Sequence, residues 1–275
     1  MTARVARVVV ALDAVSENRA AIDTAARLAA RWQARLHAVF IEDDDLLRLA
    51  NLPFARQVSL GAGVEQLTLQ QAERQIRAFA EYARRDLEAA ALRHGIAWTF
   101  DIVRGAPAAA VTDATEGDFL VAGSATRPIG AHFRIDCRWW SAVDTPVPSF
   151  LLAARQWEQT AAVIALLRNR EPTAERLLGA AARVSEESGG DRLTVLCPAE
   201  LGEAEGFDPW LSDRLAGYPL PVEIDLGPSD LAGLIRRIVE LDGRLIAIAA
   251  DDPHARPQSL RRLVTQTGCD VLVVR

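Results

Sequence analysis

The chain has 275 residues, of which half are apolar and a quarter are charged, and its formal net charge is −6. This composition is typical of a folded globular protein. All 31 basic residues are arginine, so a Walker-type phosphate loop and lysine Schiff-base chemistry are excluded. Residues 1–153 carry 17 arginines against 18 acids and residues 154–275 carry 14 against 19, so neither half is a basic nucleic-acid surface. No apolar run reaches the ~18 residues that a membrane span needs and no signal peptide is evident, so we expect a cytoplasmic protein.

The first half alternates strand and helix patterns. Short apolar runs predict strands, and apolar residues three or four positions apart predict helices. The longest periodic segment, residues 64–93, predicts a helix ~45 Å long. Its apolar residues, Phe79 among them, are expected on one face. The predicted strands are 7–12, 35–41, 98–103, 119–122 and 150–153, and the predicted helices are 17–32, 46–50, 64–93 and 107–115.

The second half repeats this order with one change. A shorter, loop-rich stretch, residues 199–217, replaces the long helix. Pro172 favours a helix start and Gly189-Gly190 favours its end. The predicted strands are 161–166, 193–196, 222–226, 245–249 and 271–274, and the predicted helices are 172–187, 230–241 and 258–266.

Apolar strands that alternate with helices indicate a parallel sheet covered on both faces. The fold class that we expect is α/β, with two tandem doubly wound, Rossmann-like domains, each a mostly parallel five-stranded sheet flanked by helices. The expected domains are residues 1–154 and 155–275, joined by a short linker at 155–160. Because the linker is short, we expect the halves to pack together.

Both halves resemble the universal stress protein family. In the first half the resemblance rests on the run that ends at Asp13, on 36–39, on Gly105-Ala106-Pro107 and on Asp118 to Gly123. In the second half it rests on Gly227-Pro228, 244–249 and 269–274. The resemblance covers most of the chain. It implies an adenine-nucleotide alpha-hydrolase-like fold and a role in stress response or regulation.

Nucleotide-binding members of this family end the fourth strand in Gly-x2-Gly-x9-Gly-Ser/Thr, where glycines let the backbone approach phosphates. This chain has Gly123 and Ser124 at the first position, but Thr126 and Asp136 stand where the other glycines belong. A carboxylate at that place would repel phosphate oxygens. In the second half, Ala250 and Pro253 replace the first two glycines. Phosphate binding is therefore doubtful in the first half and not expected in the second.

Asp13 matches the acidic residue that follows the first strand in the family, where it lies beside the adenosine part of the nucleotide. Open α/β sheets bind ligands just outside the carboxyl ends of their strands. Asp13 could instead cap the next helix, as could Ser16. Both interpretations stay open. The second half has Arg168 near this position and no equivalent acid. The candidate nucleotide cleft consists of Asp13, Val39, Gly123, Ser124 and Arg127.

Three other patterns have simpler explanations. The acidic run 42–45 could attract Mg²⁺ or Ca²⁺, but a solvated loop that leads into a helix explains it. His132, Asp136 and Cys137 have metal-binding side chains, but no partner cluster is present. The three cysteines, Cys137, Cys197 and Cys269, are far apart and are expected to be buried small residues. We assign no catalytic residue and no metal site.

The leading hypothesis is a non-catalytic universal-stress-type protein without a required cofactor. The first alternative is a sensor that binds ATP in the first-half cleft, and the second is a nucleotide hydrolase on the same fold. By resemblance, the two halves form an intramolecular pseudo-dimer through strands 150–153 and 271–274. We also expect a homo-oligomer or an unidentified protein partner. We expect neither a nucleic-acid partner nor a membrane partner.

Overall fold

The computed structural model describes residues 5–14, 18–52, 56–59, 63–105, 115, 117–123, 128–129, 133–134, 149–153, 162–187, 189–190 and 192–275. The predicted helix 107–115 lies outside these residues except for Thr115, which is not helical. The predicted linker 155–160 and the domain boundary at 154/155 also lie outside them.

The first half forms five parallel strands in the order β9-β6-β1-β2-β5. The central strands β1 and β6 are buried along almost their whole length because both faces of the sheet are covered. These strands are β1 (Arg7–Asp13), β2 (Arg35–Asp43), β5 (Trp98–Gly105), β6 (Asp118–Gly123) and β9 (Ser149–Ala153).

The second half repeats this strand order as β14-β13-β10-β11-β12. Each strand again pairs in parallel with its neighbours within the half. The strands are β10 (Val163–Leu166), β11 (Leu193–Cys197), β12 (Val222–Leu226), β13 (Leu245–Ala249) and β14 (Asp270–Val274). Both halves therefore show the strand order of a doubly wound sheet, as the sequence predicts.

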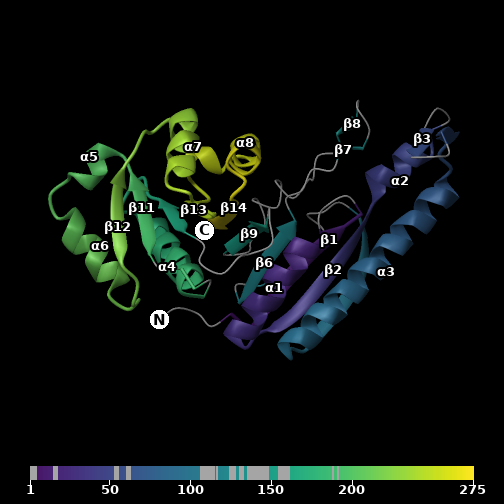
Figure 1. Cartoon of the computed structure of the whole chain (residues 1–275), viewed down its shortest axis with the longest axis horizontal. Helices are drawn as coiled ribbons and strands as arrows, with labels where there is room; N and C mark the ends of the chain where they lie inside the picture. Colours follow the sequence, from purple (N-terminus) through teal and green to yellow (C-terminus); the bar gives the residue numbers. More distant parts are fainter. Residues whose placement is uncertain are drawn as a thin grey trace.

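The two halves join into one ten-stranded sheet (Figure 1). Strand β14 pairs with β9 in antiparallel register, with Leu272 opposite Leu151 and Val274 opposite Ser149. This confirms the predicted meeting of the two final strands. Because this pairing is antiparallel, the strands of the two halves run in opposite directions. The carboxyl ends of the first-half strands therefore lie opposite the carboxyl ends of the second-half strands, across the length of the strands.

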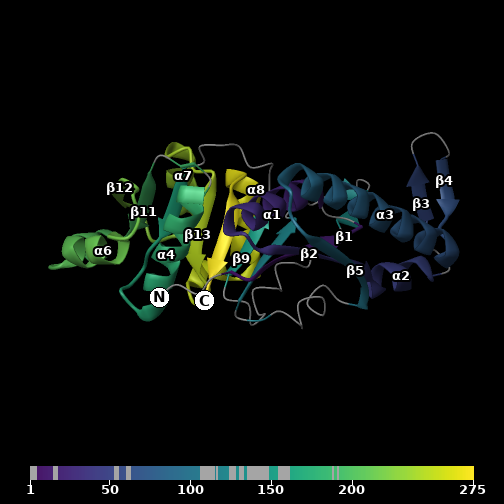
Figure 2. The same ribbon diagram turned by 90° about the horizontal axis from the view of Figure 1, so that it is seen from below.

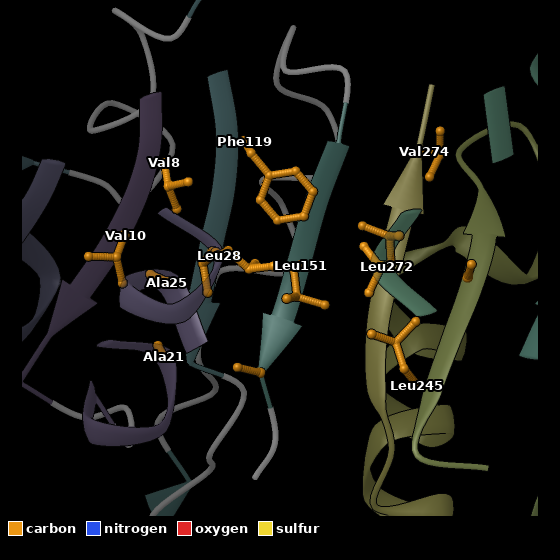
Figure 3. Close-up of a cluster of buried hydrophobic side chains, with 14 of the residues drawn as sticks. Val8, Val10, Ala21, Ala25, Leu28, Phe119, Leu151, Leu245, Leu272 and Val274 are labelled. Atoms are coloured by element: carbon orange, nitrogen blue, oxygen red, sulfur yellow. The ribbon is translucent and has the colours of Figure 1, made fainter. Parts of the chain in front are cut away.

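Helices cover both faces of the sheet. One face packs against α1, α3, α4 and α6 and the other against α7 and α8. The first of these apolar layers continues across the seam, where Leu151 of β9 and Leu272 of β14 both contribute to it (Figure 3). The helices are α1 (Asn18–Trp32), α2 (Asp44–Ala50), α3 (Leu69–His94), α4 (Pro172–Glu187), α5 (Ala199–Gly202), α6 (Phe207–Leu215), α7 (Leu231–Glu240) and α8 (Pro257–Thr267), with a short 3-10 turn, η3, at Pro253–Ala255.

The start of the long helix was predicted wrongly. Residues 64–66 belong to a hairpin of β3 (Arg56–Ser59) and β4 (Gly63–Gln66), and the helix begins only after Thr68. The Thr68 hydroxyl accepts from the Gln71 N–H, and the Gln71 side chain accepts from the Thr68 N–H, which is a capping box. The hairpin and α2 lie beside the amino-terminal end of α3, at the end of the molecule opposite α6 (Figure 2). At 26 residues, α3 is ~39 Å long.

Two further predictions need correction. The stretch 199–217 contains α5 and α6, and Phe207, Leu211 and Leu215 of α6 are buried in the core. Phe79 is 41% exposed, so it does not share the buried face of α3. A two-residue ladder, β7 (Pro128–Ile129) with β8 (Phe133–Arg134), stands apart from the main sheet. Within the described residues, no helix is both long enough and apolar enough to cross a bilayer.

Candidate functional site

The topological switch point of the first half lies between β1 and β6, and the candidate crevice of this half is expected at the carboxyl ends of these strands. Strand β1 leads to β2 on one side and β6 leads to β9 on the other, so the chain changes direction at this point of the sheet. Asp13 ends β1 and Gly123 ends β6, and the register pairs Ala11 with Ala122. The fold thus brings Asp13 and Gly123 to adjacent strand ends at the topological switch point, where open α/β sheets bind ligands.

Asp13 is held in place through its main chain. Its N–H donates to Asn18 Oδ1 at 3.2 Å, and Asn18 Nδ2 donates to the Asp13 carbonyl at 2.7 Å. Asn18 is the first residue of α1, so these bonds connect the strand end to the helix start. Asp13 is 7% exposed. Ser16, the alternative cap in the sequence, lies outside the described residues.

Val39 lies four positions before the end of β2. It pairs with Ala11 and is 4% exposed within the apolar layer that includes Val9 and Ala122. The structure therefore places Val39 in the buried core. Ser124 and Arg127, the remaining members of the candidate cleft, lie outside the described residues.

The matching place in the second half has opposite chemistry. Arg168 follows β10 as Asp13 ends β1, and its Nε donates to Asp252 Oδ2 at 3.3 Å. Asp252 follows β13, and its side chain is only 2% exposed. Arg168 Nη2 also donates to the Ser229 carbonyl, beyond β12, at 2.8 Å. One guanidinium therefore joins the loops that follow three strands.

A second set of bonds closes the loop after β13. Asp252 Oδ1 accepts from the His254 N–H at 2.7 Å and so caps η3. His254 Nε2 lies 3.0 Å from the Ser229 carbonyl, so the loops after β12 and β13 are tied together twice.

A cavity of about 290 Å³ remains beside the Arg168–Asp252 pair. Its walls include the carboxyl-bearing residues Glu171, Asp251 and Asp252 in addition to Arg168. This volume is at the lower end of the range for small-molecule sites. The walls carry more acidic than basic groups, which disfavours a polyanionic ligand.

A larger groove, about 1000 Å³, lies near the seam on the side of α1 and α4. Trp32 and Phe119 of the first half line it together with Arg183, Tyr218 and Arg275 of the second. The rings of Trp32 and Phe119 meet edge to face, with centroids 4.8 Å apart. No sequence pattern could have indicated this groove, because its residues come from elements far apart in the chain.

Asp118 is the first residue of β6, so it lies at the end of this strand opposite Gly123. Arg7 holds it with two bonds, Nε to Oδ1 at 3.0 Å and Nη2 to Oδ2 at 2.7 Å, and the Thr115 N–H donates to Oδ2 at 2.7 Å. Burial by itself would raise the pKa of Asp118, but the bonds from Arg7 and Thr115 outweigh it and hold this pKa below its usual value. Asp118 therefore has a structural partner.

The acidic run 42–45 spans the end of β2 and the start of α2, so no loop separates the two. Arg104 Nε donates to Asp44 Oδ1 at 3.1 Å. Across the part of the chain that the structure describes, no three His, Cys, Asp or Glu side chains are grouped to hold a metal ion. Cys137 and its neighbours His132 and Asp136 fall outside that part.

Cys197 and Cys269 are buried and unbridged, as predicted for both. Burial raises the pKa of the Cys197 thiol, and the nearby Asp225 carboxylate raises it further. The Cys269 Sγ donates to the Gly243 carbonyl at 2.9 Å. Neither thiol has the electropositive, exposed surroundings of a reactive cysteine.

No protein-family model matches the sequence, and no curated protein matches it. Solved structures do match. A universal stress protein from Archaeoglobus fulgidus DSM 4304 is 13% identical over 97% of this chain and 96% of its own, with a TM-score of 0.59. A putative universal stress protein from Pseudomonas aeruginosa UCBPP-PA14 is 16% identical over 98% and 93%, with a TM-score of 0.60. The chain therefore has the universal stress protein fold over nearly its whole length.

A third match has a different context. The cytoplasmic domain of a prokaryotic cation chloride cotransporter is 13% identical over 98% of this chain and 94% of its own, with a TM-score of 0.52. The same two-half architecture thus occurs in universal stress proteins and in a transporter domain. Since the fold hosts more than one role, function has to be argued from the site.

Proposed function

We propose that this chain is a non-catalytic protein of the universal stress type, with a role in stress response or regulation, and that its second half does not bind ATP. The observation that carries the proposal is the Arg168–Asp252 pair at the switch point of the second half. A nucleotide at that place would have to separate a guanidinium from a carboxylate that is 2% exposed. Leaving a buried charge without its partner is costly.

Electrostatics favour the same conclusion. Arg168 is the one basic residue in the wall of the 290 Å³ cavity, and Asp252 already neutralises it. Glu171 and Asp251 would then face the phosphates with no compensating cation in the wall. Like charges at close range disfavour binding.

We assign no catalytic residue to the first half. Hydrolysis needs a base or a metal that activates the nucleophile. Among the described residues, β1 ends in Asp13 and β2 ends in Glu42-Asp43, and the one to which we give a role is Asp13. Its role in the family-like arrangement is binding, with no proton transfer implied.

The continuous sheet supports a further part of the proposal, that the two halves act as an intramolecular pseudo-dimer. Their shared strand order and the antiparallel β9–β14 pairing are what a pair of related halves would produce. In this arrangement the second half stabilises the first and presents surface to partners.

The second candidate function is an adenine-nucleotide sensor that uses the first-half crevice. Asp13 and Gly123 lie at adjacent strand ends, where the second half has the Arg168–Asp252 pair instead. An aspartate suits the hydroxyl and amino groups of adenosine, and a glycine allows close backbone approach. ATP or a related nucleotide would then be the ligand.

Calorimetric titration with ATP and Mg²⁺ tests both candidates, after a denaturing extraction has shown whether nucleotide co-purifies. D13N keeps the side-chain shape and removes the charge, and R168Q is the matched change in the second half. We expect at most one nucleotide per chain. Any binding heat should be lost in D13N and kept in R168Q.

Three outcomes separate the candidates. No heat in the wild-type protein supports the non-binding proposal. One site that D13N abolishes moves the sensor to first place. Binding of two nucleotides per chain, or metal-dependent ATP turnover by the purified protein, would overturn the proposed function.

A further inference from the structure

The groove near the seam, which we name the seam groove, has a floor that both halves build. Phe119 of β6 pairs with Ser149 of β9, and Ser149 pairs in turn with Val274 of β14, so the three residues form one row across the seam. All three line the groove, and Phe119 and Val274 lie at the same end of the seam (Figure 3). Because serine is smaller than its two neighbours in the row, the floor leaves room above the seam.

The walls of the seam groove also come from both halves. Trp32, the last residue of α1, lines it from the first half. Gly179, Ala180 and Arg183 line it from α4, and their spacing of three and four positions places them on one face of that helix. The Tyr218 hydroxyl lies 3.5 Å from the place that a Cβ on Gly179 would take. Aromatic rings therefore stand on both sides with small residues between them, and such walls suit a planar aromatic ligand.

Two of these aromatic side chains carry hydrogen-bond donors without acceptors. The Trp32 Nε1 is buried and has no hydrogen-bond partner among the described residues. The Tyr218 hydroxyl makes no hydrogen bond either within the part of the chain that the structure describes. A buried donor without an acceptor costs free energy, and folded proteins rarely leave one. A ligand that brings an acceptor to this wall would remove the cost.

The charges of the seam groove favour a ligand with one negative charge. Arg183 is half-buried and forms no ion pair with any described residue, and Arg176 lines the groove one face-turn before Gly179. Most of the carboxylates in the described walls are already paired: Asp118 with Arg7, Glu175 with Arg214 and Glu187 with Arg31. The planar guanidinium of Arg183 can therefore bind a carboxylate of a ligand through two hydrogen bonds. Glu186, which also lines the groove, disfavours a ligand with more negative charge.

The seam groove is separate from the switch points of both halves. Asp118 and Phe119 stand at the start of β6, whereas Gly123 ends this strand. Among the described residues, the groove has no wall in common with the cavity beside Arg168. A ligand in the groove would contact both halves at once, and so it would stabilise the joined arrangement of the two halves.

The size and the location of the seam groove are those of a small-molecule site. Its volume of about 1000 Å³ is at the upper end of the range for such sites, so two or three fused rings fit. Pockets for small molecules occur preferentially where two structural units meet, and they combine apolar walls with a few polar groups. Here the apolar walls are aromatic, and the polar groups are the donors of Trp32, Arg183 and Tyr218.

We propose that the seam groove binds a small aromatic carboxylate. The rings of the ligand lie between Trp32 and Tyr218, above the row that Ser149 centres, and its carboxylate binds Arg183. The Tyr218 hydroxyl donates a further hydrogen bond to this carboxylate. The proposal is independent of nucleotide binding, because the groove contains neither Asp13 nor Arg168.

Calorimetric titration of the full-length protein with 2-naphthoate tests this proposal, and 2-naphthalenemethanol is the uncharged probe with the same rings. We expect one 2-naphthoate per chain, and an affinity for the alcohol that is at least about tenfold lower. R183Q removes the guanidinium and should weaken the binding of 2-naphthoate about tenfold, while the affinity for the alcohol stays unchanged. The comparison of the two probes separates a lost carboxylate contact from a damaged groove.

G217L tests the location of the site. Gly217 lines the groove, and an added Cβ there would meet no atom within 4 Å, so the fold should tolerate a side chain that narrows the groove. This variant should weaken the binding of both probes. R77Q on α3 is the matched control, because it makes the same change as R183Q on a helix that contributes no described residue to the groove, and it should bind both probes as the wild type does.

Circular dichroism of every variant should match that of the wild-type protein. A wild-type protein without saturable binding of 2-naphthoate up to millimolar concentration would overturn the proposal. So would equal affinity for the two probes, or a site for 2-naphthoate that either R183Q or G217L leaves intact.

Discussion

Substituting either partner of the Arg7–Asp118 ion pair should lower the free energy of unfolding, and we expect the two losses to be unequal. The Asp118 side chain is 3% exposed and that of Arg7 is 32% exposed. R7Q leaves a buried carboxylate with only the bonds from Thr115, whereas D118N leaves a guanidinium that water can reach. Breaking a buried pair costs about 3–5 kcal/mol, which we reduce to about 2–4 kcal/mol for R7Q because Arg7 is partly solvated. D118N keeps the Thr115 bond and should cost about 1–2 kcal/mol.

The pH dependence has a definite sign. The pKa of Asp118 is lowered in the folded wild-type protein, so the stabilisation is fully present at neutral pH and is lost as the pH falls through this lowered pKa. In R7Q the effect of burial is no longer outweighed, so the carboxyl protonates at higher pH. The deficit of R7Q relative to wild type should therefore be largest near neutral pH and should shrink as the pH falls and the carboxyl of R7Q protonates.

Urea unfolding followed by circular dichroism, at neutral and at mildly acidic pH, measures both effects. The double variant R7Q/D118N completes a double-mutant cycle that isolates the pair from other contacts of Arg7. Equal losses in the two single variants, or a larger loss in D118N, would refute the argument. A deficit of R7Q that grows on acidification would also refute it.

Other predictions concern caps, core and thiols. T68A removes the capping box and should cost about 0.5–2 kcal/mol, and G95A should cost about 1–2 kcal/mol because Gly95 has a φ of 65°; urea unfolding measures both. L272A removes a fully buried side chain at the seam and should cost about 2–5 kcal/mol, so a loss below 1 kcal/mol would contradict its place in the core. Cys197 and Cys269 should resist alkylation at mildly alkaline pH until urea unfolds the chain, as peptide mass mapping would show.

The pattern of apolar residues predicted the strands well, because buried parallel strands are continuous apolar runs. The pairing of β9 with β14 followed from the apolar edges of the final strands and from the family resemblance. The start of α3 was missed because the pattern extends into β4, and only the Thr68 cap marks the boundary. Helix α6 was missed because it is short and follows the left-handed Gly206, which resembles a loop signal.

The candidate site was only partly predictable. Asp13 and Gly123 could be expected at one strand edge, since each follows an apolar strand. The sequence shows that the second half has no acid at the position equivalent to Asp13, which lies near Arg168. The pairing of Arg168 with Asp252 was not visible in the sequence, because 84 positions separate the two residues and the contact depends on the order of the strands. Phe79 shows the same limit, since it fits the apolar period of α3 but is 41% exposed.

The central claim is that two halves with the same strand order differ in chemistry at their carboxyl edges. Equilibrium dialysis with labelled ATP and Mg²⁺, combined with an assay for released phosphate, measures this directly as nucleotides bound per chain. We expect at most one bound nucleotide per chain and no release of phosphate. R168Q should bind as much nucleotide as the wild-type protein. Two nucleotides bound per chain, or one that R168Q removes while D13N does not, would contradict this claim.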